Sequence, residues 1–308
     1  MQWGQIKTLF ILCFLILDIY LLMQFLDKRE QADLGILEQQ DTSIEEQLED
    51  DEIVVGPLPD EEYEETFISV RPKVFTEEEY DELLALDGQK SIMIHKNFIL
   101  SQFEESIQIP ENVTEEELEG LINQTIIFPE SYTFWDWNKR TNLLIFFQKE
   151  GDRPIYYNQN GLILVYLNDN NEALFYTQTM LGEAESRAEK KRLIKPIKAI
   201  ETLYNNNELH SGDEITEVNI GFHTRIPLDS GIQVFAPTWK IRVNDEINYF
   251  VNAMEGYVFA SDETNFLKDV LDMSIDYIQT LDDDVEEKAF IENHMNEKLE
   301  LLIRGETE

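Results

Sequence analysis

Residues that could carry out catalytic chemistry are scattered through this sequence and form no recognisable active-site motif. No HExxH, GxSxG, P-loop or GxGxxG pattern occurs. The single cysteine, Cys13, leaves the rest of the chain without a disulfide or a thiolate metal site. We therefore expect a protein that is not an enzyme, with no catalytic residues, no cofactor and no metal. The four histidines have no paired spacing: His95, His210, His223 and His294.

Carboxylates are the most abundant reactive groups. The chain has 63 acidic and 24 basic residues, a formal charge of −39, so it should repel nucleic acid, which proteins bind by neutralising phosphate. We expect no nucleic-acid partner. An acid pair of the glycosidase type is not excluded by composition, but the acidic residues concentrate in residues 27–66 and 261–308 rather than at strand ends. His223 and Arg225 would share one strand face, where a structural histidine is the simpler interpretation.

One carboxylate lies where hydrocarbon is expected. Leu9 to Leu26 is an apolar run of 18 residues, about 27 Å of helix, close to the thickness of a bilayer core. No small-residue cleavage site follows it, which favours an uncleaved signal anchor. Asp18 in its middle costs about 2.5–3.5 kcal/mol on insertion scales and usually faces a partner or a cavity.

We therefore predict that Asp18 contacts another transmembrane helix, with its neighbours three and four residues away on the same face. The alternative is a protonated or snorkelling carboxylate that the segment tolerates. The predicted contact residues are Asp18, Phe14, Leu15, Leu21 and Leu22.

The orientation of this segment is not decided by charge. Lys7 precedes it and Lys28 and Arg29 follow it, so the positive-inside count is nearly balanced. A short head and a long acidic body favour a cytoplasmic N-terminus and an extracytoplasmic domain.

Two further features could form a partner surface. In "FWDWNKR", Trp135 and Trp137 would share a strand face and could stack on glycan, or could belong to the core or an interface. A basic segment could receive the acidic tether, the tail or an acidic partner, or could be a solvated helix face. Its members are Arg187, Lys190, Lys191, Arg192, Lys195 and Lys198.

The elements that must position these residues are helices mixed with antiparallel strands. Thr76 with Glu79 and Thr114 with Glu117 form capping boxes, which predict helix starts. A third helix is expected over 183–205, interrupted or restarted at Pro196. Strands separated by turn signals are expected over 91–100, 142–181 and 214–260. The stretches 143–166 and 238–259 resemble each other, which suggests two related sheet units or two ordinary hairpins.

This pattern predicts an α+β fold. We expect a cytoplasmic head over 1–7, a transmembrane helix over 8–26 and an extended acidic tether over 27–66. Two α+β units would follow, over 67–180 and 181–260, then an acidic helical tail over 261–308. The tail has one apolar stripe, which we expect to pack on its own domain, with partner binding as the alternative. The stripe consists of Leu267, Leu271, Ile275, Ile278, Leu281 and Val285.

Three stretches carry a family resemblance: "MQWGQIKTLFILCFLILDIYLLMQFL", "IKAIETLYNNNEL" and "IQVFAPTWKIRVNDEINYFVNAMEGYV". Through them the chain, from Met1 to about Phe259, resembles the YycI (WalI) family. These are accessory proteins of the YycG/YycF (WalK/WalR) two-component system of low-GC Gram-positive bacteria. The acidic tether and the tail after Ser261 depart from that family pattern.

The resemblance implies one transmembrane helix with its N-terminus in the cytoplasm and an extracytoplasmic α+β domain related to YycH. The implied partners are a YycH-like sister protein and the sensor histidine kinase, whose activity is modulated by transmembrane contacts in control of cell-wall metabolism. Asp18 lies in the matching stretch, so the helix-contact role applies to that position. A tethered module that binds a cell-wall glycan or peptide is the alternative function.

Overall fold

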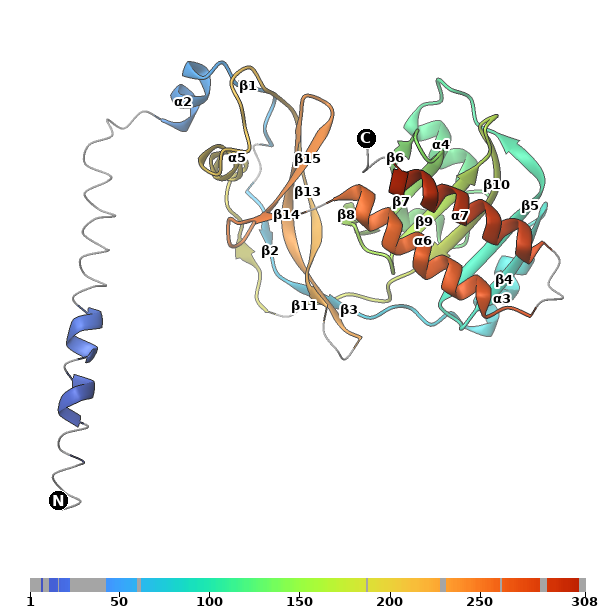
Figure 1. The fold of residues 1–308 in the computed structure, drawn as a ribbon, viewed down its shortest axis with the longest axis horizontal. Helices are drawn as coiled ribbons and strands as arrows, with labels where there is room; N and C mark the ends of the chain where they lie inside the picture. Colours follow the sequence, from blue (N-terminus) through green and yellow to red (C-terminus); the bar gives the residue numbers. More distant parts are fainter. Residues whose placement is uncertain are drawn as a thin grey trace. The chain divides into compact units, whose positions relative to one another are not determined.

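The computed structural model describes residues 7, 11–15, 17–22, 43–59, 62–186, 188–227, 231–260, 262–282 and 287–304 (Figure 1). The chain divides into two compact units, Met1–Ile53 and Val54–Glu308.

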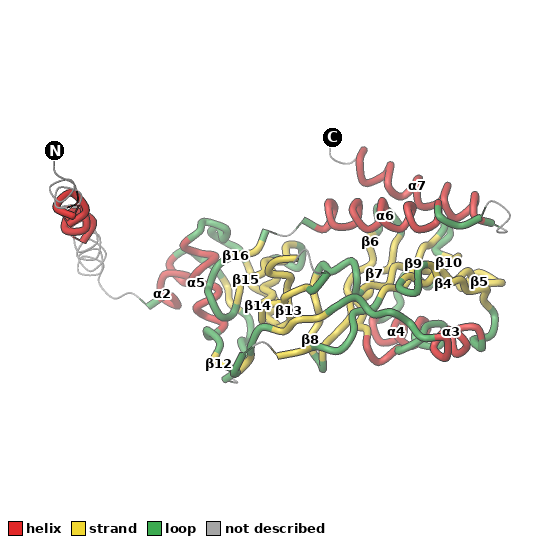
Figure 2. Tube along the Cα trace, turned by 90° about the horizontal axis from the view of Figure 1, so that it is seen from below, coloured by secondary structure: helices red, strands yellow, loops and turns green. Residues whose placement is uncertain are grey.

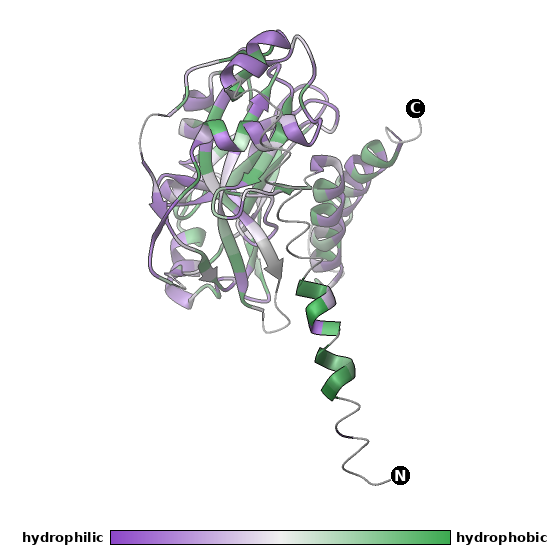
Figure 3. Ribbon diagram, turned by 90° about the vertical axis from the view of Figure 1, so that its left-hand side faces the viewer, coloured by the Kyte–Doolittle hydropathy of each residue, from purple (hydrophilic) through white to green (hydrophobic). Residues whose placement is uncertain are grey.

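In the first unit, the described residues of 11–22 are helical and exposed, and they are strongly hydrophobic (Figure 3). In the described part of the chain, no helix is both long enough and apolar enough to cross a membrane. Helix α2 (Ile44–Asp50) begins at Ser43, whose hydroxyl accepts a hydrogen bond from the Glu46 amide at 3.2 Å. This helix lies inside the segment expected to be an extended tether, because a side-chain cap stabilises a helix start despite the surrounding charge.

The second unit is a mixed α+β structure with a large sheet, as predicted. Its first half is organised around the long antiparallel pair β13 and β14, which β15 and β16 extend as a meander. Strand β1 pairs parallel with β13, and β3 pairs with β14 and β11. The strands of this half are β1 (Val54–Val55), β3 (Ile68–Val70), β11 (Glu185–Ser186), β13 (Glu214–Pro227), β14 (Gln233–Val243), β15 (Ile247–Asn252) and β16 (Val258–Phe259).

The other half is antiparallel, in the order β6, β7, β9, β10, β5, β4. The two halves are joined by β8 (Arg153–Tyr156), which is antiparallel to β7 and parallel to β13. Only two residue pairs join β7 and β8, so the resembling stretches 143–166 and 238–259 have different strand pairings. The strands of this half are β4 (Gln89–Ile94), β5 (Phe98–Gln108), β6 (Tyr132–Asn138), β7 (Leu143–Glu150), β9 (Leu162–Leu167) and β10 (Glu172–Thr179).

Helices cover both faces of this half, α6 and α7 on one side and α3 and α4 on the other (Figure 2). Alternate residues of β7 therefore enter two different hydrophobic clusters, with Ile145 in one and Phe146 in the other. The capping boxes of α3 and α4 are formed as predicted. The helices are α3 (Glu77–Leu84), α4 (Glu115–Ile122), α5 (Pro196–Asn205), α6 (Glu263–Gln279) and α7 (Lys288–Arg304), with a 3-10 turn η1 (Pro129–Ser131).

The described part of the tail packs on its own domain, as expected, whereas Val285 of the predicted stripe lies outside the described residues. Leu267 and Leu271 of α6 and Met295 of α7 are fully buried. They belong to the cluster that contains Ile145 of β7 and Leu164 of β9. The tail thus completes the core of a sheet that lies more than 100 positions earlier in the chain.

The predicted third helix is wrong over its first half. Among the described residues of 183–205, only Pro196–Asn205 is helical. Lys191–Arg192 forms strand β12, which pairs antiparallel with β2 (Glu64–Glu65). Proline at the first helical position starts α5 there and forbids its continuation toward the N-terminus. The basic residues before it pair instead with an acidic segment that is distant in sequence.

Strands β8 and β13 approach each other closely at Gly221. A Cβ atom at this position would lie 2.5 Å from the Pro154 carbonyl oxygen and 2.5 Å from the Tyr156 ring. Only glycine allows Tyr156 to pack there, and this contact brings the two halves of the sheet together around the cavity described below.

Candidate functional site

The residues predicted to contact a transmembrane partner are all described and all exposed. They occupy the helical stretches 11–15 and 17–22, three or four positions from Asp18. Leu21 and Leu22 lie in the same helical stretch as Asp18, three and four positions after it, so helical geometry places them on the same side as the carboxylate. The contact with a partner helix stays a prediction.

Trp135 and Trp137 do not share a face, so that expectation is wrong. Trp135 packs in the cluster beneath α6, whereas Trp137 packs in the opposite cluster with Leu118 of α4. The cause is a β-bulge: Phe134 pairs with Phe146 and Asp136 with the adjacent residue of β7, so Trp135 is the extra residue. An extra residue in a strand moves the side chains that follow it to the opposite face of the sheet.

The basic segment pairs with the acidic segment that follows β1. Arg187 lies outside the described residues. Lys191 and Arg192 form β12, and Arg192 Nη2 lies 2.9 Å from Glu62 Oε2. Lys190 Nζ lies 3.1 Å from Glu65 Oε1. We call residues 62–66 the strap.

Glu65 is the most heavily engaged residue of the strap. Its Oε1 lies 2.5 Å from Arg153 Nη1 of β8 as well as close to Lys190. Burial raises the pKa of Glu65, but the hydrogen bond from Lys190 and the charge of Arg153 outweigh this effect and lower the pKa below its usual value. The carboxylate is therefore ionised at neutral pH and joins the strap to Arg153 of β8 and to Lys190, which precedes β12.

Tyr63 fixes the rest of the strap. Its ring packs edge-on against Trp239 at 5.5 Å between centroids, and its carbonyl accepts from the Leu193 amide at 2.9 Å. Trp239 Nε1 in turn donates to the Ile194 carbonyl at 2.9 Å. The strap is thus held by a backbone pair, aromatic packing and ion pairs.

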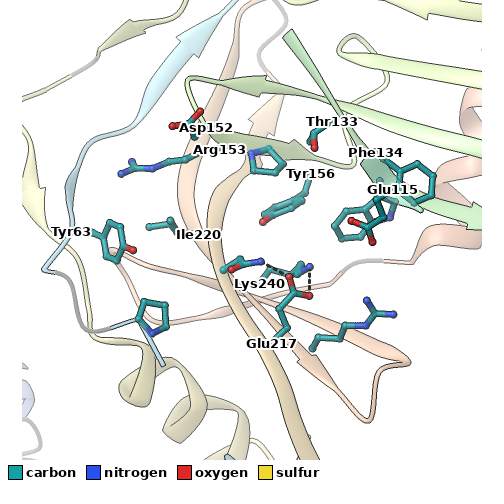
Figure 4. Close-up of a pocket in the computed structure, with 15 residues that line it drawn as sticks. Tyr63, Glu115, Thr133, Phe134, Asp152, Arg153, Tyr156, Glu217, Ile220 and Lys240 are labelled. Carbon is teal, nitrogen blue, oxygen red and sulfur yellow. Dashed lines mark hydrogen bonds and ion pairs between the residues drawn. The ribbon is translucent and has the colours of Figure 1, made fainter. Parts of the chain in front are cut away.

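A cavity of about 560 Å³ lies between the strap, β6, β8, β13 and β14 (Figure 4). We call it the cleft. Lys240 of β14 is at its centre and only 8% exposed. Its Nζ lies 2.8 Å from Glu217 Oε2 and 5.2 Å from the centre of the Trp135 ring. Glu217 also accepts a hydrogen bond from Asn219. The cleft is lined by Pro59, Tyr63, Glu115, Thr133, Phe134, Trp135, Asp152, Arg153, Pro154, Tyr156, Glu217, Asn219, Ile220, Lys240 and Arg242.

A second cavity of about 370 Å³ shares Trp135, Lys240 and Arg242 with the cleft. Glu263, at the start of α6, accepts from Trp135 Nε1 at 3.3 Å and from Asn138 Nδ2 at 3.2 Å. Burial raises the pKa of Asp136, and the charge of nearby Glu263 raises it further. Trp135 therefore links α6 to both cavities.

His223 is a structural residue in this fold. It is 8% exposed and stacks on Phe259 at 4.4 Å between ring centroids. Its Nδ1 lies 3.2 Å from the Thr224 carbonyl oxygen, and burial lowers its pKa. Within the described ranges, no group of three or more His, Cys, Asp or Glu residues could hold a metal ion.

The fold therefore defines a mixed α+β domain with a large sheet, preceded by a hydrophobic helical stretch. The family model of the YycI protein matches residues 31–254, more than half of the chain, and the chain belongs to the YycI family. Membership of this family supports a role in regulation of the YycF/YycG two-component system. The matched range begins after the apolar stretch.

Nine chains of solved structures match. One is the crystal structure of YycH from Bacillus subtilis, with a TM-score of 0.36 and 13% identity, covering 65% of this chain. This chain spans about half, 54%, of the length of that structure. No curated protein matches.

Sequence reasoning missed the cleft. Lys240 and Arg242 alternate with the buried residues Trp239, Ile241 and Val243 in "TWKIRV". Two cations inside a strand that is otherwise buried are a signal that could have been noticed. Their partners, Glu217 and the strap, are distant in sequence and carry no such signal.

Proposed function

We propose that this chain is a single-pass membrane-anchored regulator that modulates a YycG/WalK-like sensor histidine kinase and acts together with a YycH-like partner. Its N-terminus would be cytoplasmic and its main domain extracytoplasmic, at the membrane of a Gram-positive cell, where the system controls cell-wall metabolism. The observation that carries this proposal is the match to the YycI family over residues 31–254.

The intramembrane part of the proposal rests on Asp18. Leu21 and Leu22 follow Asp18 by three and four positions in the same helical stretch and are exposed. A polar group in hydrocarbon is stabilised when a neighbouring helix offers a hydrogen-bond partner, which contributes about 0.6–2 kcal/mol. The proposed contact is therefore between this face and a helix of the kinase or of the sister protein.

The strap supports a route from the anchor to the domain. The chain that follows β1 is attached to β8 and β12 through Glu65 rather than running free. A displacement of this segment would therefore act on Arg153, on the strand that both halves of the sheet share. Regulation through contacts of this kind needs no catalytic residue, and we propose that the protein is not an enzyme.

The alternative function, binding of cell-wall glycan on a tryptophan pair, loses the feature that suggested it. Trp135 and Trp137 lie on opposite sides of β6 because of the bulge. A flat sugar face cannot stack on both rings.

The proposal is tested by co-purification from membranes. The tagged chain would be expressed with the kinase and the sister protein, and the variants Asp18→Leu and Asp18→Asn would be compared with the parent. Asp18→Leu should lose most of the kinase and change its autophosphorylation. Asp18→Asn, which keeps a hydrogen-bonding group, should retain more of both.

A chain with a foreign transmembrane segment serves as the second comparison. Normal capture and normal kinase activity in both Asp18→Leu and this chimaera would refute the intramembrane mechanism. If the parent itself captures neither protein, the regulatory assignment fails.

A further inference from the structure

Three cations line the cleft in a strongly acidic protein. Lys240 and Arg242 are two residues apart on β14, so their side chains leave the same face of the strand, and both line the cleft and the second cavity. Arg153 lines the cleft from the opposite side, on β8. Figure 4 shows Arg153 and Lys240 on different strands that border the cleft.

Two of these cations are already in ion pairs, Arg153 with Glu65 and Lys240 with Glu217. Glu115 and Asp152 are exposed. Glu217 is the only lining carboxylate that is not exposed, and Lys240 and Asn219 already hold it. Arg153 is paired with Glu65 of the strap, so an anion would have to bind at Lys240 and Arg242.

Hydrogen-bond donors in the cleft also lack acceptors. The Nε atom of Arg242 is buried and has no hydrogen-bond partner, while its Nη2 donates to the Asp245 carbonyl at 2.7 Å. A buried donor without a partner is costly. Lys240 has three donors, and one of them is used by Glu217. An anion between the Lys240 and Arg242 side chains would accept hydrogen bonds from both.

The remaining lining provides further hydrogen-bonding groups. Tyr63 and Tyr156 turn their hydroxyl groups toward the centre of the cleft in Figure 4. Burial and the charge of Glu217 raise the pKa of Tyr156, so its hydroxyl keeps its proton at neutral pH and can donate. A volume of about 560 Å³ is within the range of small-molecule sites.

We propose that the cleft binds a small organic ligand through a carboxylate group that lies against Lys240 and Arg242. A planar carboxylate matches the donor geometry of a guanidinium, whereas a lysine alone would bind any anion as a point charge. Because Tyr63 also lines the cleft, the ligand would contact the strap itself. This assignment goes beyond the proposed kinase regulation and does not depend on it.

The test uses the full chain in detergent, titrated with N-acetyl-alanyl-alanine, with its C-terminal amide and with citrate, up to about 10 mM. Isothermal calorimetry measures binding, and Trp135 beside Lys240 provides a fluorescence signal. The free acid and citrate should bind saturably, and the amide at least tenfold more weakly. Arg242→Gln and Lys240→Met should each weaken binding at least tenfold, and Arg304→Gln, an exposed control, should leave it unchanged.

Arg242→Gln decides the result if Lys240→Met fails to fold, since Arg242 is half-buried and Gln keeps a polar group there. Absence of saturable binding would overturn the proposal. So would equal binding of acid and amide, or unchanged affinity in Arg242→Gln. Inorganic phosphate that binds as tightly as the carboxylates would overturn the choice of carboxylate. Because no kinase is present, these outcomes are separate from those of the co-purification.

Discussion

Glu65 Oε1 lies 2.5 Å from Arg153 Nη1, across 88 positions of sequence. This pair joins the strap to β8, the strand on which the two halves of the sheet meet. The side chains are 13% and 23% exposed, so solvent screens the interaction less than it screens a surface pair.

Replacing Glu65 should release the strap. Glu65→Gln removes the charge that binds both Arg153 and Lys190, and we expect the free energy of unfolding to fall by about 1–2 kcal/mol. Hydrogen exchange of residues 62–66 should accelerate at the same time. Chemical denaturation and exchange mass spectrometry measure the two effects.

Glu62→Gln is the matched control, because its ion pair with Arg192 is exposed on both sides. It should change stability by less than about 1 kcal/mol. Equal effects of the two substitutions would contradict the role assigned to Glu65.

The attachment of the strap should also depend on pH. The pKa of Glu65 is lower in the folded protein than its usual 4.5, so its stabilising contribution is complete above about pH 4.5 and is lost as pH falls through the folded value. Comparing the unfolding free energies of the parent and Glu65→Gln from pH 7 to pH 3 should show their difference shrinking in the acidic range. A difference that stays constant would show that the charge is not responsible.

Shortening a core residue of the tail should destabilise the domain. Leu271 of α6 is fully buried in the cluster with β7 and β9, so Leu271→Ala should cost about 2–5 kcal/mol in thermal or urea unfolding. Ile303→Ala, at a residue that is 50% exposed, should cost less than about 0.5 kcal/mol. A small effect at Leu271 would mean that the tail is dispensable for the fold.

Alanine substitutions at two glycines should change the stability of the protein in opposite directions. Gly221→Ala would place its Cβ atom against the backbone of Pro154, so we expect a loss of about 1–3 kcal/mol. Gly120, inside α4, has nothing within 4 Å of a Cβ atom, so Gly120→Ala should gain up to about 1 kcal/mol. A melting temperature below that of the parent for Gly221→Ala, and above it for Gly120→Ala, would agree with the close approach of β8 and β13.

The elements that sequence predicted well are those whose causes are local. The capping boxes of Thr76 and Thr114 involve residues three positions apart, and the hydrophobic strands are marked by adjacent turn residues. The helix expected before Pro196 was wrong because pairing with Glu64 and Glu65, more than 120 positions away, overrides local propensity.

The candidate site could be predicted only in part for the same reason. A single inserted residue at Trp135 reverses the faces of β6, and no local pattern announces it. The cleft depends on long-range approach of Lys240, Glu217 and Arg153, which are brought together by the shared strand. The contact role of the residues around Asp18 stays a prediction that rests on helical spacing alone.

The packing of the tail sets an order of events during synthesis. The face of β7 and β9 that carries Ile145 and Leu164 is covered by Leu267 and Leu271, so it stays uncovered until more than 100 further residues have been made. Such a nascent sheet would expose a broad apolar surface, which is a hazard for aggregation and a target for chaperones. These contacts join residues that are far apart in sequence, so we expect them to form late and slowly during folding.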